Sequence, residues 1–155
     1  MKRIFLAGII QGSLVESAIH NQDYRERIKR LLAESLPDAQ VYCPVTAHPN
    51  SLAYDDAKGR QVFLHHVELA RNSDMVIAYL PSASMGTAIE LWETHRNGTP
   101  VVSITPLTVN WVIRFLSDLV VADLEEFAAA CRDGRIAALL DSDRSCRPRR
   151  ERGDA

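Results

Sequence analysis

Short apolar runs alternate with longer amphipathic stretches along most of the chain. Such runs are typical of strands, and the run at residues 4–7, which no polar residue interrupts, is typical of a strand buried on both faces of a parallel sheet. They predict five strands, at residues 4–7, 40–43, 75–80, 100–105 and 119–121. Between and after these strands, the spacing of apolar residues predicts helices at residues 16–36, 61–72, 87–97, 110–117 and 123–131.

Strands that alternate with helices predict an α/β fold, because each parallel strand needs a crossover connection. We expect a flavodoxin-like or Rossmann-like, doubly wound sheet of five parallel strands in the order 2-1-3-4-5, with helices on both faces. In such a sheet, ligands bind beyond the carboxyl ends of the strands, where the strand order reverses. This rule brings residues 8–13, the irregular segment at residues 45–59 and residues 82–90 together in one cleft.

Composition narrows the class of protein and of partner. The 155 residues are 46% apolar and 25% charged, which suits a globular domain with a substantial core. A net charge of −2 gives no tendency toward nucleic acid or membrane surfaces. No stretch reaches the roughly 18 apolar residues that span a bilayer. The opening apolar run is too short for a signal peptide, so we expect a cytoplasmic protein.

The chain is expected to form one domain over residues 1–140, followed by an arginine-rich, disordered tail over residues 141–155. The cysteines Cys43, Cys131 and Cys146 form no ligand-like cluster, and their odd number argues against a disulfide framework. No residues have the spacing of a metal site, and we expect neither a metal nor a cofactor.

The segment from Ser82 to Trp92 carries the most specific chemistry. It connects the third strand to a helix, where small residues let the backbone approach a ligand and free amides bind an anion. Glu90 is its one carboxylate. Two roles stay open for Glu90. In a capping box, the glutamate returns to the backbone amide of Thr87. Alternatively, Glu90 is a nucleophile whose ionised form the helix start favours.

Three segments together resemble the nucleoside 2-deoxyribosyltransferase superfamily, which includes the 2′-deoxynucleoside 5′-monophosphate N-glycosidases. They are Phe5-Leu6-Ala7-Gly8, Ser73-Asp74-Met75-Val76-Ile77-Ala78 and Ser84-Met85-Gly86-Thr87-Ala88-Ile89-Glu90-Leu91. The similarity covers about residues 3–121, and its most specific part is the Ser-x-Gly-x-x-x-Glu run. It implies that Glu90 attacks the anomeric carbon and displaces the nucleobase, after which water or a second base resolves the glycosyl-enzyme.

The same resemblance implies a set of substrate-binding residues. Ser84 matches a serine that contacts a 5′-phosphate, and Gly12 and Ser13 match a glycine-rich loop that holds sugar and phosphate. Hydrolases of monophosphates carry arginines in that loop, where this chain has Gln11 and Ser13. No fork-shaped cation is therefore expected in this loop, and a plain nucleoside is a rival substrate. Arg25, on the first helix, is expected to point largely outward. The expected substrate-binding residues are Gly8, Ile10, Gly12, Ser13, His48, Ser84, Gly86, Thr87 and Asn110.

A further departure from the family concerns the acid that protonates the leaving base. The family places an aspartate about eight residues before the aspartate of the third strand, and counting back from Asp74 gives His66. A histidine with a pKa near neutrality could protonate the base. The alternative is a surface or partly buried histidine without a catalytic role. Asp55 and Asp56 are the other candidates for the acid.

These observations predict an N-glycosidase that acts on a (2′-deoxy)nucleoside or its 5′-monophosphate, with Glu90 and His66 as catalytic residues. Base exchange in the same pocket, the deoxyribosyltransferase reaction, is one alternative. A non-catalytic nucleotide-sensing module is the alternative from another class, and the histidine in place of the aspartate favours it. The resemblance also implies a homodimer or larger assembly, because the region around Asn110 reaches a neighbouring subunit's site in the family.

Overall fold

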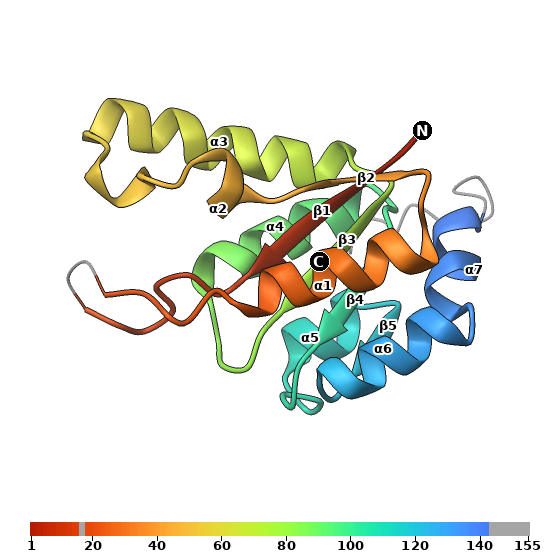
Figure 1. Cartoon of the computed structure of the whole chain (residues 1–155). Helices are drawn as coiled ribbons and strands as arrows, with labels where there is room; N and C mark the ends of the chain where they lie inside the picture. Colours follow the sequence, from red (N-terminus) through yellow and green to blue (C-terminus); the bar gives the residue numbers. More distant parts are fainter. Residues whose placement is uncertain (16–17, 143–155) are drawn as a thin grey trace.

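A computed structural model describes residues 1–15 and 18–142, which form a parallel sheet between two layers of helices (Figure 1). The strands are β1 (Lys2–Gly8), β2 (Ala39–Tyr42), β3 (Met75–Tyr79), β4 (Val101–Ile104) and β5 (Leu119–Val121). Their parallel pairing and their order, β2-β1-β3-β4-β5, confirm the expected flavodoxin-like fold. The central strands β1 and β3 pair from Ile4 with Met75 to Gly8 with Tyr79.

The helices divide between the two faces of the sheet. They are α1 (Tyr24–Ser35), α2 (Pro44–Ala47), α3 (Asp56–Asn72), α4 (Met85–Arg96), α5 (Trp111–Leu116), α6 (Leu124–Arg132) and α7 (Arg135–Asp141). Helices α1, α6 and α7 cover one face, and α3, α4 and α5 cover the other. None of the helices within the described ranges is both long enough and apolar enough to cross a membrane.

Strand β1 shows how the continuous apolar runs produce this layering. Ile4 and Leu6 are buried in the core that contains α1, α6 and α7, whereas Phe5 and Ala7 are buried in the core under α3, α4 and α5. Successive side chains of a strand point to opposite faces, so a strand covered on both sides must be apolar at every position. This requirement explains why the strands were predictable.

The first long helix begins later than expected, at Tyr24 instead of near residue 16. The Gln22 side-chain amide donates hydrogen bonds to the Ile9 carbonyl at 3.1 Å and to the His20 carbonyl at 2.8 Å. The His20 amide in turn donates to the Ile10 carbonyl at 2.8 Å. These bonds satisfy backbone groups beside the end of β1, so residues 18–23 stay irregular there. Residues 16 and 17 lie outside the described part of the chain.

The segment at residues 45–59 is more ordered than expected. It contains α2 and a short 3-10 helix, η1 (Ser51–Ala53), and α3 begins at Asp56 instead of residue 61. The Asp55 carboxylate accepts the Lys58 amide at 2.8 Å and so caps α3. Helix α7 was not predicted at all. The expected tail falls almost entirely on residues 143–155, which lie outside the described residues.

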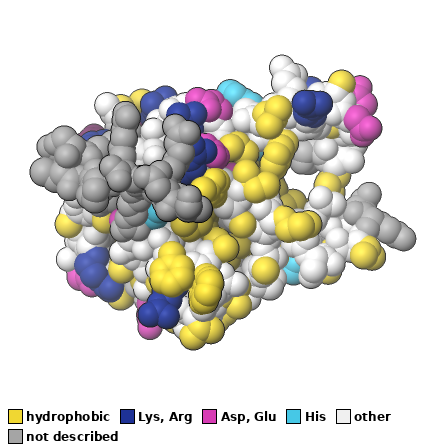
Figure 2. Space-filling model, turned by 180° about the vertical axis from the view of Figure 1, so that it is seen from behind, with side chains coloured by type: hydrophobic (Ala, Val, Ile, Leu, Met, Phe, Trp, Pro, Cys, Tyr) yellow, Lys and Arg dark blue, Asp and Glu magenta, His cyan; other side chains and the backbone are white. Residues whose placement is uncertain are grey.

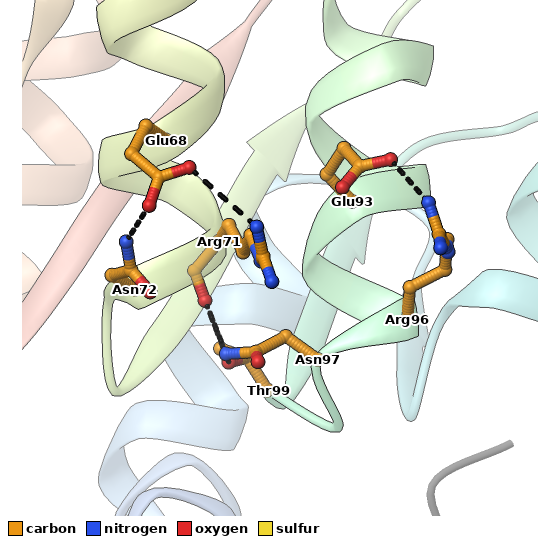
Figure 3. Close-up of polar contacts among 7 residues, drawn as sticks. All are labelled: Glu68, Arg71, Asn72, Glu93, Arg96, Asn97 and Thr99. Carbon is orange, nitrogen blue, oxygen red and sulfur yellow. Dashed lines mark hydrogen bonds and ion pairs between the residues drawn. The ribbon is translucent and has the colours of Figure 1, made fainter.

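Polar contacts hold α3 beside α4 at their carboxyl-terminal ends (Figure 3). The Asn97 side-chain amide donates to the Arg71 carbonyl at 2.8 Å, and the Thr99 hydroxyl donates to the same carbonyl at 3.2 Å. Farther out, Glu93 and Arg96 form an ion pair at 3.0 Å within α4. These contacts fix the ends of the two helices farthest from the cleft. Residues at and before the amino-terminal ends of α3 and α4 line the cavity described below.

Candidate active site

A cavity of about 350 Å³ opens beyond the carboxyl end of β1, where the strand order reverses. Ala7 and Gly8 at the end of β1 form part of its lining, and Ser84, Thr87 and Glu90 of the α4 region form one wall. The opposite wall comes from α3 and the connection before it, through Leu52, Tyr54, Val62, Phe63 and His66. This is the position at which a doubly wound sheet binds its ligands.

Most of the predicted site residues line this cavity. They are Gly8, Ile10, Gly12, His66, Ser84, Gly86, Thr87 and Glu90. Three others do not line it in this structure. Ser13 is exposed in the loop after β1, Asn110 caps α5 by accepting the Val112 amide at 3.0 Å, and His48 lies behind His66. Substrate contacts by these three residues stay predictions.

Ser84, and not Thr87, caps helix α4. The Ser84 hydroxyl accepts the Thr87 amide at 3.4 Å and the Thr87 hydroxyl at 3.1 Å. The expected Thr87–Glu90 capping box is therefore wrong, because the helix already begins at Met85. Thr87 occupies the third helical position, and its buried hydroxyl has Ser84 as its partner. Glu90 moves into the second turn and is not needed as a cap.

Glu90 presents a carboxyl group to the cavity. Its backbone carbonyl accepts the Thr94 hydroxyl at 2.7 Å, whereas no residue in the described ranges donates a hydrogen bond to its carboxyl. Burial raises the pKa of Glu90 from 4.5 to about 8, and the positive charge of Arg25 opposes that rise only in part. This shift favours the protonated form of the carboxyl in the free protein. Because Glu90 lies in the second turn and the dipole of a helix acts mainly in its first turn, the helix start does little to offset the shift. The ionised, nucleophilic Glu90 stays a prediction.

Arg25 is a charged residue of the cavity that was not predicted from the sequence. It was expected to point outward, but it is 3% exposed and lines the cavity beside Gly8. Its guanidinium donates to the Leu6 carbonyl at 3.0 Å, the Gly8 carbonyl at 3.2 Å and the Gln22 side-chain oxygen at 2.7 Å. A fixed guanidinium therefore does lie in the cleft, contrary to the expectation from the sequence.

Gly8 is required at the point where β1 meets the cavity. Its φ of 155° is uncommon for other residues, and an added Cβ would lie 2.6 Å from the Tyr24 hydroxyl oxygen and 3.1 Å from the Tyr79 carbonyl. The Tyr24 hydroxyl donates to the Ile9 carbonyl at 3.1 Å, and its ring stacks on Tyr79 with centroids 4.1 Å apart. The glycine thus lets a tyrosine pack directly behind the floor of the cavity.

His66 forms part of an aromatic cluster on the α3 wall. Its ring centroid lies 5.2 Å from that of His48, 5.9 Å from that of Tyr42 and 6.3 Å from that of Phe5. Its Nε2 is buried and has no hydrogen-bond partner. Burial, together with the neighbouring His48 and His65, lowers the pKa of His66 from 6.5 to about 4. The ring is thus uncharged at neutral pH, and its pKa is lower than the near-neutral value expected from the sequence.

The other candidates for the acid, Asp55 and Asp56, lie on α3 and just before it. Asp55 caps α3, and Asp56 is exposed in the first turn of that helix. Neither carboxylate lines the cavity. Tyr54 does line it, and its hydroxyl lies 3.1 Å from Nδ1 of His48. The side chains on this wall are thus mainly aromatic and uncharged, as suits a planar nucleobase.

No protein-family model matches the sequence, and no curated protein matches it. Among solved structures, a 2-deoxyribosyltransferase from Bacillus psychrosaccharolyticus is similar with 18% identity and a TM-score of 0.59, over 81% of this chain and 90% of that one. A conserved protein from Enterococcus faecalis V583 is similar with 20% identity and a TM-score of 0.58, over 86% of this chain and 98% of that one. The Clostridium botulinum CMP N-glycosidase BcmB is similar with 17% identity and a TM-score of 0.51, over 84% of this chain and 98% of that one. Such identities establish a common fold, and the fold implied by the sequence resemblance is confirmed.

Proposed function

We propose that this protein cleaves the N-glycosidic bond of a (2′-deoxy)nucleoside or its 5′-monophosphate through a covalent intermediate on Glu90. The observation that carries the proposal is the position of Glu90. Its carboxyl accepts no hydrogen bond from the described residues and faces a cavity at the switch point of the sheet. The Ser-x-Gly-x-x-x-Glu resemblance supports the same assignment, as does the fold shared with a 2-deoxyribosyltransferase and a CMP N-glycosidase.

The reaction proceeds in two displacements at the anomeric carbon. First, a Glu90 carboxylate oxygen attacks C1′, the bond from C1′ to the base nitrogen breaks, and its electron pair leaves with the base, which takes up a proton. Then a water oxygen attacks C1′, the bond to Glu90 breaks and the carboxylate is restored, while the water gives up a proton to solvent that balances the proton taken up by the base. One water molecule is consumed, and free base and free sugar are released. Neither step needs a cofactor.

The cavity offers distinct surroundings to the two halves of such a substrate. Ser84 and Gly86 at the start of α4, together with Gly8 and Gly12, bring backbone and hydroxyl groups to the sugar side. Two backbone amides at the helix start, those of Met85 and Gly86, precede the amide that Ser84 caps and can bind a 5′-hydroxyl or a phosphate oxygen. The base would lie against the wall formed by α3.

A substrate panel tests this proposal. Purified protein is incubated with ribo- and deoxyribonucleosides and with their 5′-monophosphates, and free base is measured by chromatography. The proposal predicts release of base from at least one substrate class. Failure with every member of the panel would overturn it and leave a nucleotide-sensing module as the better account, with ligand binding as the check on that alternative.

Base exchange is the alternative reaction in the same pocket, because the glycosyl-Glu90 intermediate can be attacked by a base nitrogen instead of water. Addition of a second free base to the panel distinguishes the two reactions. Hydrolysis predicts free sugar in proportion to released base. Formation of a new nucleoside at the expense of free sugar would identify the protein as a transferase.

A second copy of the chain is the proposed partner of the face formed by α4 and α5. Trp92, Trp111 and Phe115 are each more than half exposed there, and Figure 2 shows hydrophobic side chains gathered on this side. Met85 is also 80% exposed and lines the cavity, so the apolar surface continues to its mouth. Such surfaces mark interaction sites. The homodimer implied by the sequence resemblance supports self-association as the occupant.

We also propose that the protein acts in the cytoplasm. Cys43 and Cys131 are both free thiols, which suits a reducing compartment. Fluorescence microscopy of the tagged chain in its own cells tests this assignment, which an extracellular or membrane-bound signal would contradict.

A further inference from the structure

Arg25 is buried without the charge partner that a buried guanidinium usually has. Its guanidinium donates to two backbone carbonyls of β1, to the neutral side chain of Gln22 and, at 3.8 Å, to the Cys43 sulfur. None of the ion pairs within the described ranges includes Arg25. Burying an uncompensated charge is costly, so any acidic group that shares the cavity with this guanidinium is expected to interact with it.

The counterpart in this cavity is Glu90. Both side chains line the same space, and they are the two charged residues among those that do. Four hydrogen bonds hold the guanidinium in place, whereas the Glu90 carboxyl accepts no hydrogen bond from any described residue. A firmly held positive charge therefore lines the same cavity as a partly buried carboxyl that has no hydrogen-bond donor from the described residues. In surroundings of low polarity, such a charge acts over longer distances than it would in water.

We propose that Arg25 is a positioning residue that stabilises the ionised form of Glu90 across the cavity and thereby supplies the nucleophile. This role rests on the proposed function. In the first displacement, the carboxylate is consumed and becomes a neutral ester. In the second displacement, the bond from C1′ to Glu90 breaks and its electron pair returns to the carboxylate, opposite the same guanidinium. Arg25 thus favours departure of Glu90 as well as its ionisation.

A purely structural role is the competing account, because Arg25 also connects α1 to β1. Both accounts predict a loss of stability when Arg25 is replaced. They differ in what they predict for the pKa of Glu90. If Arg25 acts through its charge, a neutral residue at position 25 raises this pKa further. If Arg25 only connects α1 to β1, the pKa of Glu90 stays the same. Tyr24→Phe is a matched control. It removes a buried hydrogen bond from α1 to the Ile9 carbonyl and leaves the charge at position 25 in place.

The test measures the Glu90 titration directly by carbon-13 NMR of protein labelled at glutamate carboxyl groups, with Glu90→Gln to assign the signal. In Arg25→Met, the midpoint should move upward by about one pH unit or more. It should stay within a few tenths of a unit of the wild-type value in Arg25→Lys and Tyr24→Phe. Arg25→Gln, which keeps a hydrogen-bond donor, replaces Arg25→Met if the latter does not fold.

The same variants are then compared by the pH dependence of kcat/KM for base release. The rise of kcat/KM with pH should shift together with the Glu90 midpoint measured by NMR. At pH 7, kcat/KM of Arg25→Met should therefore be about tenfold lower for each pH unit by which that midpoint moves upward. An unchanged Glu90 midpoint in the neutral variant that folds would overturn the role of Arg25. A wild-type protein that shows the expected midpoints but releases no base would overturn the proposed function and leave the electrostatic role intact.

Discussion

The Ser84 hydroxyl accepts hydrogen bonds from both the amide and the hydroxyl of Thr87, at 3.4 Å and 3.1 Å. This contact places the start of α4 at Met85, one turn earlier than a Thr87 cap would. Glu90 consequently lies in the second turn, where it has no backbone amide to satisfy and faces the cavity. The same serine that begins the helix therefore makes the carboxyl of Glu90 available for chemistry.

The raised pKa of Glu90 predicts a dependence of stability on pH. The folded chain binds this proton more tightly than the unfolded chain, so the carboxyl favours the native state below about pH 4.5 and loses that contribution as pH rises through about 8. Glu90→Gln is neutral throughout. Relative to this variant, the melting temperature of the wild type should fall between pH 5 and pH 9, by roughly 2–4 °C for each kcal/mol lost.

Glu93→Gln is the control for that comparison, since Glu93 belongs to the same helix and pairs with Arg96 outside the cavity. Its melting temperature should keep a constant offset from that of the wild type. If Glu90→Gln also keeps a constant offset over this range, the raised pKa of Glu90 is incorrect.

His66 is predicted to act as a neutral hydrogen-bonding group. Its pKa of about 4 keeps the ring uncharged above pH 5, and its buried Nε2 is free to bind a polar atom of the base. His66→Gln should lower kcat/KM roughly 3- to 10-fold, the scale of one hydrogen bond, by the same factor from pH 5.5 to pH 8. The exposed neighbour His65 gives the matched variant His65→Gln, which should remain within twofold of the wild type. If the pH profile of wild-type kcat/KM instead changes slope between pH 6 and 7, and this change is absent in His66→Gln, then His66 is a proton donor.

Two glycine substitutions are expected to act in opposite directions on stability. In Gly8→Ala, the new Cβ would displace the Tyr24 hydroxyl, so unfolding free energy should fall by about 1–3 kcal/mol. In Gly59→Ala, within α3, the Cβ meets no heavy atom within 4 Å, and stability should rise by about 0.5–1 kcal/mol. Urea denaturation of both variants checks the pair, and equal stability of Gly8→Ala and wild type would contradict the packing of Tyr24 behind Gly8.

Charge placed on the α4 face should dissociate the proposed homodimer. Trp92→Arg puts a cation in the centre of the apolar surface, whereas Ala33→Arg adds the same charge to the exposed side of α1 on the opposite face. Analytical ultracentrifugation should show a dimer for the wild type and Ala33→Arg and a monomer for Trp92→Arg. A monomeric wild type at micromolar concentration would refute self-association.

The sequence predicted the sheet because the central strands β1, β3 and β4 are buried over most of their length and are therefore largely apolar. The edge strands β2 and β5 are short and only partly buried. Arg25 was missed for a physical reason: it shares a helix face with Ile28 and Leu32 at spacings of three and seven residues, but its charge suggested an outward position. Only the carbonyl oxygens at the end of β1, which belong to another element, make its burial possible. The capping residue of α4 could not be predicted for a similar reason. Ser84 and Thr87 are both good N-cap residues, and the packing of α4 in the fold determines that Ser84 is the one used.

The most direct measurement of the central claim is the rate of base release by Glu90→Gln, compared with Glu93→Gln and the wild type on the best substrate of the panel. Loss of the nucleophile should lower kcat by roughly three orders of magnitude or more, while substrate binding remains detectable by calorimetry. Glu93→Gln should remain within twofold of the wild type. If Glu90→Gln retains a tenth or more of the wild-type rate, Glu90 is not the nucleophile.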